Sequence, residues 1–266
     1  MRLTPAERRV AGHVREHPDD LVLRSSAELA RLTGTSKATV SRLLRSLGFR
    51  DAQEVRGELL AARVSGVPIG PSAPAGGPAA DERGVEARNL DAGLASLERA
   101  GRATLAATLA GAARILVIGH RNSYPVALHL RQQLAQARPG VRVAPEPGQA
   151  LGEELADLGP DDVVVVVGFR RRATVLPHLV DAAVEAGATV VLLADPSAAG
   201  LAARASVAFA VLCPIDSPSA FDSYAAPMAV VAVLANDVYA LLGADARSRV
   251  ARIAGLYDAL GEVESR

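Results

Sequence analysis

The sequence predicts two structural classes in one chain. An all-α helix-turn-helix domain is expected at residues 1–64, and a three-layer α/β domain with a mostly parallel five-stranded sheet at residues 83–266. The first part has the pattern of successive capped amphipathic helices, whereas apolar runs of strand length alternate with helical segments in the second. Residues 65–82 are rich in Pro, Gly, Ala and Ser, which predicts a flexible linker.

Two helix starts in the first part carry the same signal. Thr4 and Ser25 are each followed three residues later by glutamate, the spacing of a capping box. Val10 and Val14 mark the buried side of the first helix, which should end near residues 17–18. After the second start, Leu29 and Leu32 are expected to face the core. One or two further helices are expected within residues 50–64, with core positions at Val55, Leu59 and Leu60.

The next helix has two different faces. Ser36 is expected to cap it after a tight turn that contains Gly34. One face has the i, i+3, i+4, i+7 spacing of a core stripe: Val40, Leu43, Leu44 and Leu47. The other is small, hydroxylated and cationic, as in a helix that enters the major groove of DNA. The residues predicted to contact DNA are Thr35, Ser36, Lys37, Ala38, Thr39, Ser41, Arg42 and Arg45. The alternative is a helical hairpin whose polar face is only solvated.

Charge and composition agree with DNA binding at the amino-terminal end. Residues 1–66 contain 12 Arg and Lys against 8 Asp and Glu, whereas the rest contains 17 against 21. The single Cys213 excludes an internal disulfide. No signal sequence and no apolar run of membrane-spanning length is recognised, so we expect a cytoplasmic protein without a membrane partner.

The second part alternates strands with helices. Strands are expected at 114–119, 141–144, 163–168, 189–194 and 206–212. Helices are expected at 85–100, 103–113, 123–137, 148–158, 174–187, 198–203, 223–242 and 246–260. The run of five valines before Gly168 has no polar alternation, which is typical of a strand covered on both faces. Ligands of such sheets bind beyond the carboxyl ends of the strands, which directs attention to the loops there.

Two of these loops have anion-binding character. The first joins a glycine turn to a helix amino terminus, which offers backbone N–H groups to an anion. The second contains three consecutive arginines, suited to bidentate contacts with phosphate or carboxylate. The residues predicted to bind an effector are Gly119, Arg121, Asn122, Ser123, Gly168, Arg170, Arg171, Arg172 and Thr174. The alternative is that the arginines are solvated or pair with acidic groups of a partner subunit. Asp195, after the fourth strand, is expected to cap a helix, and the alternative is that it forms a wall of the pocket.

Signals for catalysis are absent from the sequence. We find no Gly-x-Gly-x-x-Gly, no Walker loop and no His/carboxylate metal spacing, and we predict no catalytic residues, metal or cofactor. His120 and His178 lie in or near the candidate site, where a lone histidine is more often a hydrogen-bonding residue than a general base.

Both halves together resemble the RpiR/MurR-like bacterial transcriptional regulators, which join a helix-turn-helix domain to a sugar isomerase (SIS) domain. The resemblance covers nearly all of the chain and is most specific at residues 26–30, 35–42 and 47–49. Gly119 to Ser123 correspond to the family's Gly-x-Gly-x-Ser phosphate loop, with Arg121 replacing the second glycine. The resemblance implies binding to double-stranded operator DNA as a homodimer or homotetramer, response to a phosphorylated sugar, and no isomerase activity.

The chain departs from the family at the second phosphate loop, Ser-x-Ser-Gly-x-Thr. Residues 168–173 lack both serines and the threonine, and Thr174 substitutes only if the loop shifts by one residue. The resemblance therefore implies an effector site without assigning the sugar phosphate. We expect a small anionic effector, phosphosugars included, or a pocket that has lost its ligand. The alternatives are a sugar-phosphate isomerase with an accessory helical domain and a ligand-free regulator that uses the SIS domain only to oligomerise.

Overall fold

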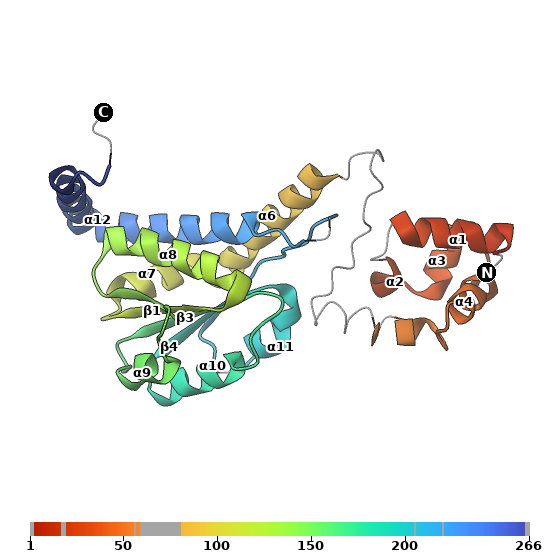
Figure 1. Ribbon diagram of the computed structural model, residues 1–266, viewed down its shortest axis with the longest axis horizontal. Helices are drawn as coiled ribbons and strands as arrows, with labels where there is room; N and C mark the ends of the chain where they lie inside the picture. The colour runs from red at the N-terminus through yellow and green to blue at the C-terminus, as the bar shows by residue number, and fades with distance from the viewer. Residues whose placement is uncertain are drawn as a thin grey trace. The chain divides into compact units, whose positions relative to one another are not determined.

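The chain divides into two compact units, each described by itself. One comprises Met1–Glu82 with Ser217–Asp222, and the other Arg83–Asp216 with Ser223–Arg266. The computed structural model, drawn in Figure 1, describes residues 3–16, 20–55, 57–58, 81–204, 206–219 and 221–263. Most of the expected linker, and the expected core positions Leu59 and Leu60, lie outside these residues. The domain limits given above therefore stay a prediction.

The amino-terminal unit is helical throughout its described elements. These are α1 (Pro5–Glu16), α2 (Asp20–Leu23), α3 (Ser26–Leu32) and α4 (Lys37–Ser46), followed by a short helical stretch at 52–55. Both predicted capping boxes are confirmed. The Thr4 backbone N–H donates to Glu7 Oε2 at 2.8 Å, and the Ser25 N–H donates to Glu28 Oε2 at 2.8 Å. Two of the orphan N–H groups at each helix start are satisfied in this way.

Apolar side chains from three helices and the stretch after them form the core of this unit. Its buried members are Val10, Leu29, Ala30, Val40, Leu43, Leu44 and Val55. The expected burial of Leu32 and Leu47 is wrong, since these side chains are 42% and 53% exposed. Each stands where a helix ends: Leu32 is the last residue of α3, and Leu47 caps α4 immediately before Gly48, whose φ of 99° turns the chain away.

The second unit is built on a five-stranded parallel sheet in the order β2-β1-β3-β4-β5. Its strands are β1 (Ile115–Gly119), β2 (Val141–Ala144), β3 (Val163–Gly168), β4 (Thr189–Ala194) and β5 (Phe209–Leu212). The predicted five strands and α/β class are confirmed. Because β3 lies between β1 and β4, the loops after these three strands meet at the carboxyl edge of the sheet.

Helices cover both faces of the sheet and make the three layers visible in Figure 1. One layer contains α6 (Glu82–Arg99), α7 (Arg102–Gly111), α8 (Tyr124–Ala137) and α12 (Ala225–Leu260). The other contains α9 (Leu151–Ala156), α10 (Leu176–Glu185) and α11 (Ala199–Ala202). The two helices expected at the end of the chain are continuous in α12 apart from non-helical backbone at Gly243, with φ 55° and ψ −114°.

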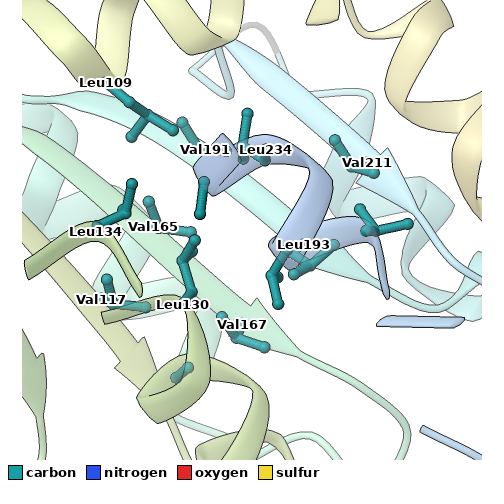
Figure 2. Packing of buried hydrophobic residues seen from close by; sticks show 14 of the residues in the cluster. Leu109, Val117, Leu130, Leu134, Val165, Val167, Val191, Leu193, Val211 and Leu234 are labelled. Atoms are coloured by element: carbon teal, nitrogen blue, oxygen red, sulfur yellow. The ribbon is translucent and has the colours of Figure 1, made fainter. Parts of the chain in front are cut away.

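Alternate residues of the strands enter two separate cores. Figure 2 shows the first, where Val117, Val165 and Val191 of the sheet face Leu130 of α8 and Leu234 of α12. The intervening strand residues form the second core against α10, α11 and their neighbours. Burial on both faces explains why the strand runs lack polar alternation.

α12 is long and apolar enough to cross a membrane by length and composition, and no other helix in the described part of the chain meets this criterion. Core helices pass the same test. Val230, Val231 and Val238 of its first half are at most 1% exposed and belong to the core shared with α7 and α8. Packing inside the domain therefore accounts for the apolar composition of this half.

One ion pair joins the amino ends of β1 and β3 and makes the unit sensitive to acid. Arg114 Nη2 donates to the buried carboxylate of Asp162 at 2.7 Å, and the Gly159 N–H also donates to it, at 2.9 Å. The Arg114 guanidinium is the main cause that lowers the pKa of Asp162 below its ordinary value.

Because the folded pKa of Asp162 is depressed, its contribution to stability is present above the ordinary carboxylate pKa and is lost as the pH falls through the folded pKa. We expect Arg114→Ala to lower the free energy of unfolding at pH 7 and to change it much less at pH 3. Urea unfolding at both pH values measures this difference. An equal loss at both would show that the variant acts through packing rather than through the ion pair.

Candidate functional sites

The hydroxyl side chains around the α3–α4 turn hold the turn itself. Thr35 Oγ1 lies 2.9 Å from Thr33 Oγ1, and Ser36 Oγ accepts from the Thr39 N–H at 3.2 Å. The Thr39 side chain is buried, with its hydroxyl 3.0 Å from that of Ser36. Gly34 adopts φ 59°, the left-handed conformation that the turn requires. These contacts fix where α4 begins.

The remaining predicted DNA contacts lie on the solvent side of α4. Lys37, Ala38, Arg42 and Arg45 are exposed, and Ser41 is half-buried. The opposite face of α4 is the buried stripe of the core, and the helix contains no acidic residue. Arg42 adds to the lowering of the pKa of Glu7 on α1, after the hydrogen bonds from Thr4 that dominate it. The structure thus brings the predicted cations together on one exposed face.

The loop after β1 packs tightly against the start of α8. A Cβ at Gly119 would lie 2.7 Å from that of Ala127 and 2.9 Å from the Ser123 carbonyl oxygen, so only glycine fits. The loop continues as a 3₁₀ turn over Arg121–Ser123. Arg121, with φ 55°, and Asn122 are exposed, whereas Ser123 is buried.

Ser123 connects this loop to the one after β3. Its Oγ accepts from the Phe169 N–H at 3.0 Å, in a contact buried at the sheet edge. The Phe169 ring is fully buried and meets Tyr224 edge to face, with centroids 5.6 Å apart. No sequence pattern marks Phe169 or Tyr224 as a site residue. Phe169 stood inside the arginine motif, but only the sheet order shows that its backbone meets Ser123.

The three arginines after β3 have different environments. Arg172 Nη1 donates to Asp195 Oδ1 at 2.6 Å, and its Nη2 donates to Ser197 Oγ at 2.9 Å. Asp195 is buried and accepts from the Ser197 N–H at 3.0 Å, which confirms its expected capping role. The acid that pairs with Arg172 therefore belongs to the same chain. Arg170 is half-buried, and Arg171 is exposed with φ 57°.

The loop glycine and threonine complete the predicted site. A Cβ at Gly168 would come within 2.4 Å of Leu176 Cδ1, so α10 packs directly on the end of β3. Thr174 is exposed. The structure thus gathers the predicted effector residues at one edge of the sheet, with Ser123 and Arg172 engaged within the protein.

The titratable groups near these loops have structural explanations. Burial lowers the pKa of His120, and burial raises the pKa of the Cys213 thiol to about 12, which keeps the thiol protonated and unreactive. Glu154 is buried and accepts from Arg142 and from Gln149. These groups do not form an acid–base pair facing the loops.

Two hollows in this unit lie away from the predicted effector residues. One, of about 410 Å³, is at the amino ends of the strands and is lined by Ala113, Pro160 and Asp162 among others. The other, of about 460 Å³, lies among the ends of α7 and α8 and the second half of α12. Arg138, Arg249 and Arg252 line it. Neither hollow is lined by a predicted effector residue.

Family models match both units. Residues 1–63 match the helix-turn-helix domain of the rpiR family, and residues 108–237 match the SIS domain. Among solved structures, the sugar isomerase domain of an RpiR transcription factor from Sphaerobacter thermophilus covers 65% of this chain and 96% of its own, with 20% identity and a TM-score of 0.55. The match to the Vibrio vulnificus NanR protein complexed with ManNAc-6P covers 97% of this chain and 94% of NanR, with 19% identity and a TM-score of 0.53.

Curated relatives are longer proteins. The bifunctional protein glk of Paraburkholderia xenovorans is 32% identical over 216 residues, which are 77% of this chain and 33% of the relative. The corresponding protein of Burkholderia orbicola gives the same values. The chain thus spans about a third of the curated relatives it matches. The structural likenesses, at about 20% identity, show the fold, and the two family models show the order of the domains.

Proposed function

Since this chain is a transcription regulator of the RpiR family, with a helix-turn-helix domain followed by a SIS domain, we propose that it binds operator DNA through α4 and senses a small anion through the SIS domain. In this proposal the SIS domain also joins two or more copies of the chain, and the protein works in the cytoplasm. The exposed cationic face of α4 carries the proposal.

In the DNA complex, the amino-terminal turns of α4 enter the major groove. Lys37 and Arg45 contact phosphates, while Ala38, Ser41 and Arg42 face base edges. Thr35, Ser36 and Thr39 act indirectly, because their hydroxyls hold the turn that positions α4. Ser36 is also exposed at the amino terminus of α4, where a phosphate can accept from backbone N–H groups.

The effector site in this proposal is the carboxyl edge of the sheet. Arg121 and Arg171 are exposed on the two facing loops, and Arg170 stands beside them. In the family's second loop, serine and threonine hydroxyls surround the phosphate, whereas this chain has guanidinium groups there. Guanidinium groups favour a compact anion that accepts bidentate hydrogen bonds. A phosphosugar belongs to this class, and the NanR structure of the same fold was determined with ManNAc-6P.

Thermal unfolding of the full chain against a panel of sugar phosphates, organic acids and inorganic phosphate tests the sensing proposal. A ligand that binds only the folded state raises the free energy of unfolding by about 2.7 kcal/mol when its concentration is a hundred times its Kd. We expect the shift to disappear in Arg170→Ala/Arg171→Ala, which leaves the Arg172–Asp195 pair intact. Val175→Ala, at an exposed side chain just after the loop, is the control for a change that removes no charge and no predicted effector residue.

One observation favours a ligand-free SIS domain as the second candidate. Arg172 is already paired with the Asp195 carboxylate of the same chain. This carboxylate occupies the position in which the anionic group of an effector would contact Arg172. If no compound of the panel shifts the unfolding temperature while operator binding is intact, the domain serves to oligomerise. Turnover of ketose or aldose phosphates would contradict both candidates, because neither includes a catalytic step.

A further inference from the structure

Two helices of the amino-terminal unit begin with the same capping box. In the first, the backbone N–H and the hydroxyl of Thr4 both donate to Glu7 Oε2, each at 2.8 Å. In the second, the N–H and the hydroxyl of Ser25 both donate to Glu28 Oε2, again at 2.8 Å each. No described group donates to the other carboxylate oxygen, Oε1, in either box. The two glutamates are thus held alike, and a difference in their roles must come from their surroundings.

Glu7 lies on the side of α1 that is turned toward the core. α1 packs against α4, and Val10 of α1 belongs to the same core cluster as Leu43 of α4. Glu7 precedes Val10 by three residues, so the two side chains share one side of the helix. Glu7 is accordingly half-buried, whereas Glu28 is exposed.

Arg42 is the cation of α4 that acts on the Glu7 carboxylate. It directly precedes the buried Leu43 but is itself exposed. The hydrogen bonds from Thr4 are the main cause that lowers the pKa of Glu7, and the charge of Arg42 lowers it further. Arg42 forms no ion pair with an acid of the described residues, so its guanidinium is available to DNA.

Glu28 provides the contrast. The hydrogen bonds from Ser25 are the main cause that lowers its pKa, and the charges of Arg24 and Arg31 lower it further. Neither arginine is a predicted DNA contact: Arg24 donates to Asp20 Oδ1 at 2.8 Å, and Arg31 belongs to α3. The two capping boxes therefore share one geometry, but only the first lies beside an arginine of the proposed recognition helix.

We propose that Glu7 is a positioning residue for DNA recognition, whose carboxylate holds one edge of the Arg42 guanidinium so that the other edge meets a guanine. A guanidinium carries several N–H donors in a planar fork, enough to serve an acid and a base at the same time. The capping box fixes the carboxylate through Oε2 and leaves Oε1 to accept from Arg42. This role rests on the proposed reading of base edges by α4 and specifies the group that orients its arginine.

The same carboxylate disfavours DNA that offers no guanine at this position. A negative charge beside the groove repels phosphates on every sequence. At the correct site the repulsion is offset, because an arginine that is already oriented loses less side-chain freedom when it bonds guanine O6 and N7. At other sites only the repulsion remains. Glu7 therefore raises the ratio of specific to non-specific affinity, which is the quantity to measure.

Glu7→Gln in the full chain tests this role without removing the helix cap, because glutamine also serves at this position of a capping box. The probes are a duplex selected from a random pool by the full chain and an unrelated duplex of equal length. We expect affinity for the selected duplex to fall about 10-fold, within the roughly 5- to 150-fold that a bidentate arginine–guanine pair provides. Affinity for the unrelated duplex should stay equal or rise. Glu28→Gln, the same substitution in the other capping box, is the matched control and should bind both duplexes like the parent.

A double-mutant cycle separates positioning from a structural role of Glu7. If Glu7 acts through Arg42, Glu7→Gln should cost no further affinity for the selected duplex when Arg42→Ala is already present. A loss of the same size in both backgrounds would overturn the proposal. So would an equal loss on the selected and the unrelated duplex, because that result would show that Glu7 only stabilises α1.

Failure of the underlying DNA-binding proposal gives a different result. If Arg42→Ala binds the selected duplex like the parent, Arg42 is not a base contact, and the role of Glu7 fails with it. If Arg42→Ala weakens binding but Glu7→Gln does not, α4 still reads the DNA and only the positioning role is overturned.

Discussion

Replacing Lys37 or Arg42 with alanine is expected to weaken operator binding by about 1–3 kcal/mol each, roughly 5- to 150-fold. Both side chains are exposed on the face of α4 opposite its buried stripe, so their removal leaves the core of the unit unchanged. A duplex selected from a random pool by the full chain serves as the probe. The variant that loses a phosphate contact should also show a salt slope flatter by about one unit.

The matched control for these variants is Arg15→Ala, which removes one exposed positive charge from the end of α1. It should bind with nearly the parent affinity, because a charge outside the groove contributes only through the general field. If Lys37→Ala and Arg42→Ala bind no more weakly than this control, α4 is not the recognition helix. Circular dichroism of all variants confirms that the helices are retained.

Replacing Arg138 with methionine is expected to destabilise the SIS domain by about 2–4 kcal/mol. Arg138 is buried and donates to the carbonyl oxygens of Leu109 at 2.5 Å, Ala110 at 3.1 Å and Ala113 at 3.2 Å, and also to that of Ala112. These carbonyls belong to the end of α7 and the residues after it, where a helix leaves acceptors without intrahelical partners. Methionine fills similar space and leaves the acceptors buried without a donor.

Urea unfolding followed by circular dichroism measures this loss. Arg99→Met, the same substitution at the exposed end of α6, is the control and should change stability by less than 0.5 kcal/mol, about the usual effect of a surface substitution. Arg138→Lys should recover only part of the loss, because a lysine ammonium cannot reproduce the planar fork of donors. Parent stability in Arg138→Met would show that water replaces the guanidinium at these carbonyls.

Local features of both units could be predicted because their signals lie within a few residues. The capping boxes at Thr4 and Ser25 need only a hydroxyl and a glutamate three positions apart. The valine run of β3 predicts a strand that is covered on both faces. Gly119 and Gly168 mark the ends of β1 and β3. The two-domain architecture, the five parallel strands and the face of α4 were therefore accessible from the sequence.

Helix ends were less predictable because a periodic pattern does not say where it stops. Leu47 continues the apolar spacing of α4, yet the chain leaves the helix there and the side chain is exposed. Likewise, the sequence suggested two final helices, and only the structure shows them joined at Gly243 with an apolar end beyond the core.

The sequence by itself determined which elements form and which faces of them are apolar, since these properties depend on neighbours along the chain. Only the tertiary structure decided which distant groups meet. The order of β1, β3 and β4 sets Ser123 against the Phe169 N–H and Arg172 against Asp195. The chain after α8 likewise places Arg138 among the carbonyls at and after the end of α7. These contacts span more than twenty residues each, and no local pattern encodes them, because a side chain's partner depends on how the layers stack.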